Sequence, residues 1–318
     1  MVFSMKKIIV VGSANTDMVV KADKLPLPGE TVMGGIFFMN AGGKGANQAV
    51  AAARLGGKVT FVAKVGNDIF GKQTIEGLEK EGVDTAYVFE DDNAPSGTAL
   101  ITVNNEGENC IVVAPGANAH LSPQDVETVT TMTEAEIILV QLEIPMETIA
   151  FIINKAKANC QKVILNPAPA QPLDSELLDG LFLITPNETE ATLLTGIKVH
   201  DKTTAAQAAD FLQKKGVQNV VITLGKQGAY LQTSNLKILV DAPSVQPIDT
   251  TAAGDTFSGA IAVAIAENMD WEKSIRFACQ AASISVTRLG AQASVPYRNE
   301  IVHFGQLISG VDNKITNN

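Results

Sequence analysis

Short apolar segments alternate with helical patterns along most of this chain, and this alternation restricts its fold more than any other feature. The apolar segments are rich in β-branched residues and end at Gly, Pro or Asn, as buried strands do. They lie at 7–13, 59–66, 136–142, 162–167, 181–187 and 219–225. Helical patterns lie between them, at 45–55, 69–81, 123–132, 146–158, 188–195 and 203–215. This order predicts an α/β fold with a doubly wound, mostly parallel central sheet flanked by helices.

Two segments interrupt the alternation, residues 17–40 and 96–115. Neither has a helical period, and the second contains the turn sequence NNEG (104–107) between two strand-like runs. We expect these segments to form a small β-sheet lid on a catalytic body made of 1–16, 41–95 and 116–318. A sheet this small has a wet face and unpaired edges, so we also expect it to pair with its copy in a homodimer.

Charge and cysteine content restrict the partners and the compartment. The formal net charge is −10, which argues against nucleic-acid or membrane partners, because both would require a basic face. The three cysteines form no CxxC pair, and this sparse use predicts a reducing, cytoplasmic location. The N-terminal apolar run, Ile8 to Val11, is too short for a signal peptide and is expected to be the first strand.

Two common nucleotide-binding motifs are absent. A P-loop requires glycine five positions before Gly43, but Phe38 stands there, and Lys44 is followed by Gly45 rather than Ser or Thr. After Gly12, the dinucleotide fingerprint has Ala14 at its second glycine position. The sequence therefore supports neither a Walker-type ATPase nor a Rossmann dehydrogenase.

The stretch DTTAAGDTFSGA (249–260) predicts an anion site with a carboxylate in it. An apolar helix follows, and the first N–H groups of a buried helix have no intrahelical partner and carry partial positive charge. The small residues at 252–254 allow an anion to approach the backbone closely. Asp255 would repel that anion, so its expected role is to accept a proton from the group that attacks it. The alternative is that Asp255 only caps the helix.

Two polar stretches are candidates for binding hydroxyl groups. In NAGGKGANQAVAAARLG (40–56), glycines, Lys44 and Asn47 gather at the start of a helix, although they are also compatible with a flexible turn and a solvated lysine. In GSANTD (12–17), Asn15 and Asp17 follow the first strand, at the edge where open α/β sheets bind ligands. They can hold a diol by two hydrogen bonds, or they form a polar turn.

Two further stretches are candidates for binding a nucleotide. Asn187 and Glu190 are three residues apart at a helix start, which suits a hydrated Mg²⁺ but also a simple helix cap. In TLGKQGAYL (223–231), a strand ends in a turn with Gly225 and Gly228, which can bring backbone beside a nucleotide.

Taken together, the motifs resemble the ribokinase (PfkB-type) family of carbohydrate kinases. The resemblance covers the chain from Lys7 to about Ile308. Two long signatures carry it, AGGKGANQA (41–49) and DTTAAGDTFSGA (249–260). Shorter ones recur in the family's order: PGET (28–31), NPAPA (166–170), ITPNETEA (184–191), VITLG (221–225) and TRLGAQASVP (287–296).

The resemblance implies ATP-dependent phosphorylation of ribose at O5, with Mg²⁺ and an activating K⁺, and dimerisation through the lid. It implies that Asp255 is the general base and that the N–H groups of Ala252, Ala253 and Gly254 form the anion hole. The implied sugar-binding residues are Asn15, Asp17, Gly43, Lys44, Asn47 and Glu143. The implied nucleotide and Mg²⁺ positions are Asn187, Glu190, Thr223, Gly225 and Gly228, with Cys279 beside adenine. The implied K⁺ ligands, largely carbonyl oxygens, are those of Asp249, Thr251, Ser285, Arg288 and Gly290, with Ser294 close by.

Two other functions remain open at this point. A related kinase would act on another sugar or on a nucleoside, and a non-catalytic sugar-binding protein would keep the pocket and lose the chemistry. The presence of Asp255, Gly254, Asn187 and Glu190 together argues against the second.

Overall fold

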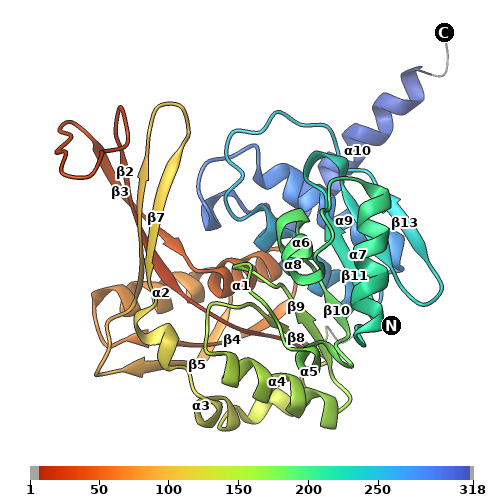
Figure 1. Ribbon diagram of the computed structural model, residues 1–318, viewed down its shortest axis with the longest axis horizontal. Helices are drawn as coiled ribbons and strands as arrows, with labels where there is room; N and C mark the ends of the chain where they lie inside the picture. Colours follow the sequence, from red (N-terminus) through yellow and green to blue (C-terminus); the bar gives the residue numbers. More distant parts are fainter. Residues whose placement is uncertain (1–6, 316–318) are drawn as a thin grey trace.

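The structure is a computed structural model, and it describes residues 7–315. Its main body is a nine-stranded sheet with helices on both faces (Figure 1). The strands of this sheet are β1 (Lys7–Val11), β4 (Lys58–Gly66), β5 (Asp84–Asp91), β8 (Ile137–Val140), β9 (Lys162–Leu165), β10 (Leu183–Ile184), β11 (Asn219–Thr223), β12 (Ala229–Gln232) and β13 (Lys237–Val240). The helices are α1 (Lys44–Arg54), α2 (Ile69–Lys80), α3 (Pro123–Glu127), α4 (Met146–Ala158), α5 (Ser175–Leu178), α6 (Glu188–Thr195), α7 (Lys202–Lys214), α8 (Ala253–Ala266), α9 (Trp271–Ser285) and α10 (Arg298–Ile315).

The sheet has the order β13-β12-β11-β10-β9-β8-β1-β4-β5. Pairing is parallel from β11 to β5 and antiparallel only in the β11-β12-β13 hairpins. The predicted fold class is therefore confirmed, and each of the six predicted segments contains a strand. Strand β5 and the antiparallel edge were not predicted.

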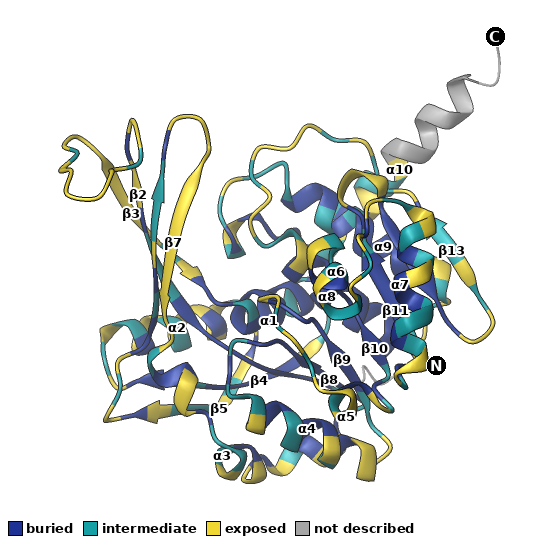
Figure 2. Cartoon of the chain, in the orientation of Figure 1, coloured by how far each residue is buried: buried dark blue, intermediate teal, exposed yellow. Residues whose placement is uncertain are grey.

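Alternate residues of β1 show how the core forms on both faces of the sheet. Ile8 and Val10 pack with buried residues of α1 and α8, such as Val50 and Ile261. Ile9 and Val11 point the other way, into a second cluster with α4 and α7. Burial on both faces explains why the strands are apolar throughout rather than alternating (Figure 2).

The direction of chain winding reverses at β1. The chain goes from β1 to β4 on one side, and later returns with β8 on the other side. Ligands bind beyond the carboxyl ends of the strands at such a switch point. Here those ends lead to Gly12 and Ser13 after β1 and to Gln141–Glu143 after β8.

A second sheet of four strands projects from the body, in the order β3-β2-β6-β7 (Figure 1). Its strands are β2 (Asn15–Lys21), β3 (Ile36–Gly42), β6 (Gly97–Val103) and β7 (Asn109–Ala114). Large apolar side chains on β3 and β7 are exposed, including Phe37, Phe38 and Val112 (Figure 2). Successive residues of a strand face opposite sides, so both faces of this sheet carry exposed apolar groups.

One predicted helix is wrong in part. The pattern at 123–132 predicts one helix, but α3 ends at Glu127 and a short 3₁₀ turn occupies Thr130–Glu134. The β-branched residues Val129, Thr130 and Thr131 lose side-chain freedom in a helix, which favours the interruption. Within residues 7–315, no helix is long and apolar enough to cross a membrane.

Candidate active site

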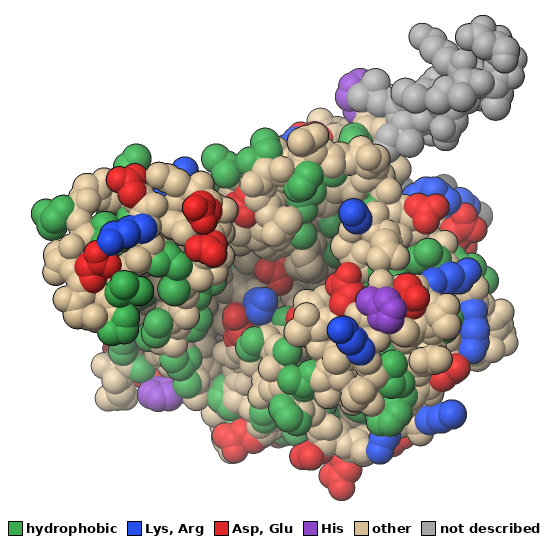
Figure 3. Space-filling view, turned by 45° about the horizontal axis from the view of Figure 1, so that its top comes forward, with side chains coloured by type: hydrophobic (Ala, Val, Ile, Leu, Met, Phe, Trp, Pro, Cys, Tyr) green, Lys and Arg blue, Asp and Glu red, His purple; other side chains and the backbone are tan. Residues whose placement is uncertain are grey.

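A hollow separates the small sheet from the body, and acidic and basic side chains lie together in it (Figure 3). A pocket in this site, here called the central pocket, lies beyond the carboxyl ends of the parallel strands. It is closed on one side by the N-terminal end of α8. Its lining residues are Lys44, Asn166, Ala168, Thr185, Asn187, Glu190, Thr223, Thr250, Ala252, Ala253, Gly254, Asp255, Phe257 and Ser258.

Helix α1 starts in close contact with the loop after β1, and this contact requires glycine. A Cβ atom on Gly45 would lie 2.6 Å from the Ser13 nitrogen, and the Gly43 backbone has a φ of 88°. A side chain at position 45 would therefore separate the helix from the strand. The close approach brings the first turns of α1, with Lys44 and Asn47, to the pocket.

Asp255 is the third residue of α8 and is almost completely buried. The alternative prediction, that it caps the helix, is wrong, because Ala252 occupies the cap position and no side chain caps this end. The Asp255 carboxylate instead accepts hydrogen bonds from Asn47 Nδ2 at 3.0 Å and Gln48 Nε2 at 2.9 Å. Its orientation is thus set by α1 rather than by its own helix.

The predicted anion-hole residues line the pocket at the same helix end. Ala252 adopts a left-handed conformation with φ 59°, and a Cβ atom on Gly254 would meet nothing within 4 Å. The Ala253 amide donates to the Thr250 carbonyl at 3.2 Å and so closes the turn before the helix. Open space therefore adjoins the positive end of α8.

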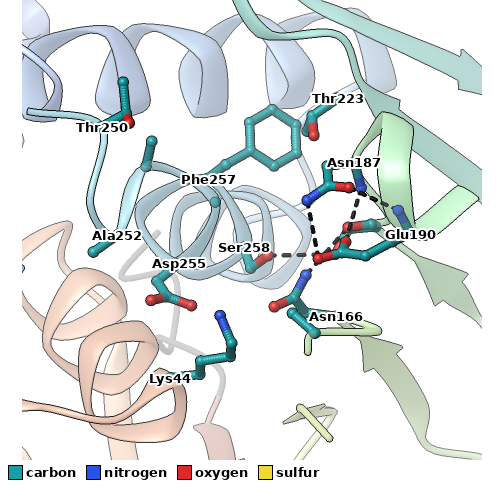
Figure 4. Close-up of a pocket in the computed structure, with 14 residues that line it drawn as sticks. Lys44, Asn166, Asn187, Glu190, Thr223, Thr250, Ala252, Asp255, Phe257 and Ser258 are labelled. Carbon is teal, nitrogen blue, oxygen red and sulfur yellow. Dashed lines mark hydrogen bonds between the residues drawn. The ribbon is translucent and has the colours of Figure 1, made fainter. Parts of the chain in front are cut away.

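Lys44 is surrounded by acids at the edge of the pocket. Burial by itself lowers the pKa of Lys44, but the charges of Asp255, Glu143 and Glu190 outweigh it and raise that pKa. Figure 4 shows its ammonium group between Asp255 and Asn166. The dipole of α1 disfavours a cation at the start of the helix. The attraction of these acids therefore stabilises the charged form of Lys44 there.

Asp17 lies on β2 with its carboxylate against the backbone of Gly42. A Cβ atom on Gly42 would come within 2.3 Å of both Asp17 carboxylate oxygens. Burial, and then the negative charges of Glu143 and Asp255, raise the pKa of Asp17 to about 6. Asn15, at the start of the same strand, accepts a hydrogen bond from Asn118 Nδ2 at 2.8 Å.

Glu143 links the loops that follow β1 and β8. It accepts hydrogen bonds from Ser13 Oγ at 2.5 Å and from the Lys44 backbone N–H at 3.1 Å. The second bond satisfies one of the free amides at the start of α1.

Asn187 and Glu190 form the cap that one interpretation of the sequence predicts. The Glu190 amide donates to Asn187 Oδ1 at 2.8 Å, and the Asn187 amide donates to Glu190 Oε2 at 2.9 Å. Both side chains also line the central pocket (Figure 4). Burial raises the pKa of Glu190. The hydrogen bond from the Asn187 amide and the charge of Lys44 lower this pKa, but burial outweighs them.

The other predicted nucleotide residues lie at different distances from the pocket. Thr223 lines it, whereas Gly225, Gly228 and Cys279 do not. Gly228 has φ 96°, and a Cβ atom there would lie 2.0 Å from the Val240 carbonyl oxygen, so it serves the turn between β11 and β12. Cys279 is buried in α9, and burial raises the pKa of its thiol to about 12.

The predicted cation residues come from two adjacent loops that Asp249 holds together. Its carboxylate accepts hydrogen bonds from the amides of Thr251 and Gly290, both at 2.9 Å. Burial raises the pKa of Asp249, but these bonds outweigh it and lower that pKa. The Arg288 guanidinium pairs with Glu300, and the hydroxyls of Ser285 and Ser294 donate to nearby carbonyls. Backbone carbonyls and the Asp249 carboxylate are therefore the main candidate ligands there. Within residues 7–315, no group of three or more His, Cys, Asp or Glu side chains is arranged to hold a metal.

Sequence reasoning missed several polar residues of the site. Gln48 and Gln141 are completely buried, and Asn166, Thr185 and Ser258 line the pocket. The family signatures in the sequence contain four of these residues: Gln48, Asn166, Thr185 and Ser258. Their hydrogen-bond partners are far apart in the sequence, so spacing alone gives no indication of their contacts.

Residues 5–298 match the pfkB family of carbohydrate kinases. The chain belongs to the pfkB carbohydrate kinase family. This kinase is 44% identical over 304 residues to the ribokinase of Haemophilus influenzae, across 94% of this chain and 98% of that one. It is 38% identical over 304 residues to the deoxyribokinase of Salmonella typhi, across 95% and 98% of the two chains.

A solved structure of Arabidopsis thaliana ribokinase, complexed with ribose and ATP, has the same fold as this kinase. The TM-score is 0.87 at 36% identity, with 94% of this chain and 98% of that chain covered. The predicted family and the ribokinase-like fold are therefore confirmed.

The raised pKa of Asp17 gives a prediction about stability. The folded-state pKa of about 6 exceeds the ordinary value of 3.8 for an aspartate, so the folded protein holds this proton more tightly than the unfolded chain. The stabilising contribution of Asp17 is complete below pH 3.8 and is lost as pH rises through 6. Asp17→Asn does not titrate, so its melting temperature should exceed that of the wild type at pH 8. The difference should shrink as pH falls toward 4. Thermal unfolding between pH 4 and pH 8 measures this difference in melting temperature. A difference that does not change with pH would contradict the titration of Asp17 as its cause.

Proposed function

We propose that this protein transfers the γ-phosphoryl group of ATP to O5 of ribose and gives ribose 5-phosphate and ADP. The observation that carries this proposal is the placement of Asp255. A buried carboxylate that does not cap its helix opens on a pocket at the positive end of that helix. The high identity to ribokinases over nearly the whole chain supports ribose as the acceptor.

In the proposed mechanism, each end of the site has a distinct role. Ribose is held by Asn15, Asp17, Gly43, Lys44, Asn47 and Glu143, and its O5 hydroxyl lies beside Asp255. Asp255 accepts the proton while O5 bonds to the γ-phosphorus and the bond to the ADP oxygen breaks. The N-terminal amides of α8, from Ala252 to Gly254, stabilise the charge on the transferred group. A loose phosphoryl-transfer transition state demands positioning more than a strong base.

We assign the nucleotide to the side of the pocket formed by α6 and β11. Asn187, Glu190 and Thr223 line that side, Gly225 and Gly228 lie in the turn that follows β11, and Cys279 lies on α9. Mg²⁺ bound to ATP would supply charge neutralisation. Because Asn187 and Glu190 already bond each other, we propose that they hold this Mg²⁺ through water.

A K⁺ ion fits the two loops joined by Asp249. Hard carbonyl oxygens and one carboxylate suit a large monovalent ion better than a transition metal. We propose that Asp249, Thr251, Ser285, Arg288, Gly290 and Ser294 surround it, next to the anion hole.

The small sheet, residues 17–40 and 96–115, is proposed to be a lid on a catalytic body of 1–16, 41–95 and 116–318. Residues 1–6 and 316–318 of that body lie outside the described residues. Water must be excluded from the site, or ATP would be hydrolysed. Asp17 lies at the root of this sheet, so sugar binding would favour its closure.

A sugar panel tests the proposed function against its alternatives. Deoxyribose is the specific competitor, because a deoxyribokinase matches the chain over a similar length. In a coupled assay of ADP release, ribose should give the highest kcat/KM among ribose, 2-deoxyribose, fructose and adenosine. A higher kcat/KM for any other sugar or nucleoside would replace the proposed substrate, and no turnover with any of them would favour a binding protein.

The role of Asp255 is tested by an isosteric substitution. Asp255→Asn keeps the shape and removes the proton acceptor, so kcat should fall roughly 10²–10⁴-fold while ribose and ATP still bind. Calorimetric titration measures the binding. Asp270→Asn is the matched control, because Asp270 is an exposed cap of α9 remote from the pocket, and it should retain wild-type kcat. Near-normal turnover of Asp255→Asn would remove the base from the mechanism.

The cation assignment is tested by ion exchange. Replacing Na⁺ with K⁺ at constant ionic strength should raise turnover. It should also slow hydrogen exchange of the amides at 249–254, because the ion bridges two loops. Omitting Mg²⁺ should abolish turnover. Exchange rates at 249–254 that do not change between the two salts would contradict the loop assignment.

The exposed apolar side chains of the small sheet support a homodimer through the lid. Ile36 is 68% exposed on β3 and Val112 is 67% exposed on β7. Exposed apolar side chains that are grouped on one sheet, rather than scattered singly, mark an interaction surface. Ile36→Glu should give monomers in sedimentation velocity and should also weaken ribose binding. Val302→Glu, at another exposed apolar position on α10, is the control and should leave assembly unchanged. A wild-type monomer at working concentration would refute this interface.

A further inference from the structure

Gln48 is a fully buried residue of α1 whose side-chain amide lies directly behind Asp255. Its Nε2 donates to Asp255 Oδ1 at 2.9 Å and to Asn166 Oδ1 at 3.0 Å. Its Oε1 accepts a hydrogen bond from Gln141 Nε2 at 2.6 Å. Both hydrogens of the amide nitrogen are thus used, and the carbonyl oxygen is paired as well.

The direction of these hydrogen bonds follows from the charge of Asp255. An ionised carboxylate only accepts hydrogen bonds, so the nitrogen of the Gln48 amide must face it. The amide oxygen of Gln48 then faces Gln141, which must donate. The series from Gln141 through Gln48 to Asp255 therefore has one direction, with each amide nitrogen donating to the next oxygen.

Two consecutive residues of α1 hold the two carboxylate oxygens separately. Asn47 donates to Oδ2 and Gln48 donates to Oδ1, so the plane of the carboxylate is fixed at both ends. Each oxygen keeps acceptor capacity for a substrate hydroxyl. With only one donor, the carboxylate would be free to rotate about its Cβ–Cγ bond.

The second donated bond of Gln48 reaches the opposite wall of the central pocket. Asn166 lies just after β9 and donates from Nδ2 to the Thr185 carbonyl at 3.2 Å. Asn166 and Thr185 both line the pocket. Gln48 therefore ties the position of Asp255 to the wall formed by the ends of β9 and β10.

We propose that Gln48 is a positioning residue for phosphoryl transfer, which fixes the Asp255 carboxylate toward the acceptor hydroxyl without touching either substrate. This proposal rests on the proposed function, in which Asp255 is the base. A displaced carboxylate would still allow both substrates to bind, but it would form the reactive geometry less often. The loss should thus fall on kcat and not on KM.

A double-mutant cycle separates this role from a structural one. Gln48→Met keeps the length and removes the donor, and kcat should fall roughly 10–100-fold, with both KM values changed less than about threefold. In an Asp255→Asn background, the same substitution should change the residual kcat less than about twofold, because the residue acts through Asp255. Equal losses of kcat in both backgrounds would overturn the proposal.

A second pair of variants controls for damage to the core. Gln48→Met leaves the Gln141 amide unpaired, which is costly in a buried site. In Gln48→Met/Gln141→Met both partners are apolar, so the melting temperature should recover toward the wild type while kcat stays low. Gln141→Met alone keeps the bond to Asp255 and should lose less kcat than Gln48→Met. Recovery of kcat together with stability in the double variant would show that Gln48 only packs.

The outcomes for Gln48 are distinct from failure of the proposed function. If the wild type phosphorylates no sugar, the function itself is wrong. If the wild type is active and Gln48→Met has wild-type kcat, only the positioning role is wrong. Should Gln48→Met not accumulate as folded protein, Gln48→Met/Gln141→Met replaces it in the cycle.

Discussion

The site depends on one buried cation placed among several carboxylates. Burial, and then repulsion from Glu143 and Asp255, raise the pKa of Asp17, and this arrangement disfavours the folded state near neutral pH. Lys44 partly offsets the repulsion, because it interacts favourably with Asp255, Glu143 and Glu190. A kinase needs acceptors for sugar hydroxyls and for a proton in one place, so some of this repulsion is inherent to the function. Lys44 allows the acids to remain close together in the pocket.

Helix α1 can supply Lys44, Asn47 and Gln48 to this pocket only because it approaches other backbones closely. Gly45 brings its first turn against the loop after β1. On its other side, a Cβ atom on Gly259 of α8 would lie 2.8 Å from the Gln48 carbonyl oxygen. Gly259 therefore sets the distance between α8, which carries Asp255, and α1, which orients it, while Gly45 sets the approach of α1 to the loop after β1. The small residues of both signatures serve packing as well as ligand approach.

Much of the fold follows from local sequence patterns. Buried strands were predictable because both faces of the sheet are covered, which leaves continuous apolar runs. Strands β5 and β13 were missed because their residues are partly exposed and mixed in polarity. Strand β12 was missed although its four residues are buried, because so short a run gives little periodic signal. Within the site, Asp255 was recognisable from the helix that it begins. Its contacts with Asn47 and Gln48 were not, because they join residues more than 200 positions apart. Asn187 and Glu190 form the predicted cap and also line the pocket, so the two interpretations of that motif do not exclude each other.

The small sheet enters and leaves the body at points where its strands are already paired. Asn15 pairs with Gly42 at the base of the first excursion, and Thr98 pairs with Ala114 at the base of the second. The tips of both excursions lie far from these bases (Figure 1). Lengthening a tip extends only a loop whose closure cost grows slowly with length. During evolution, the proposed lid is therefore free to be reshaped for acceptors of different size while the proposed catalytic residues stay in register.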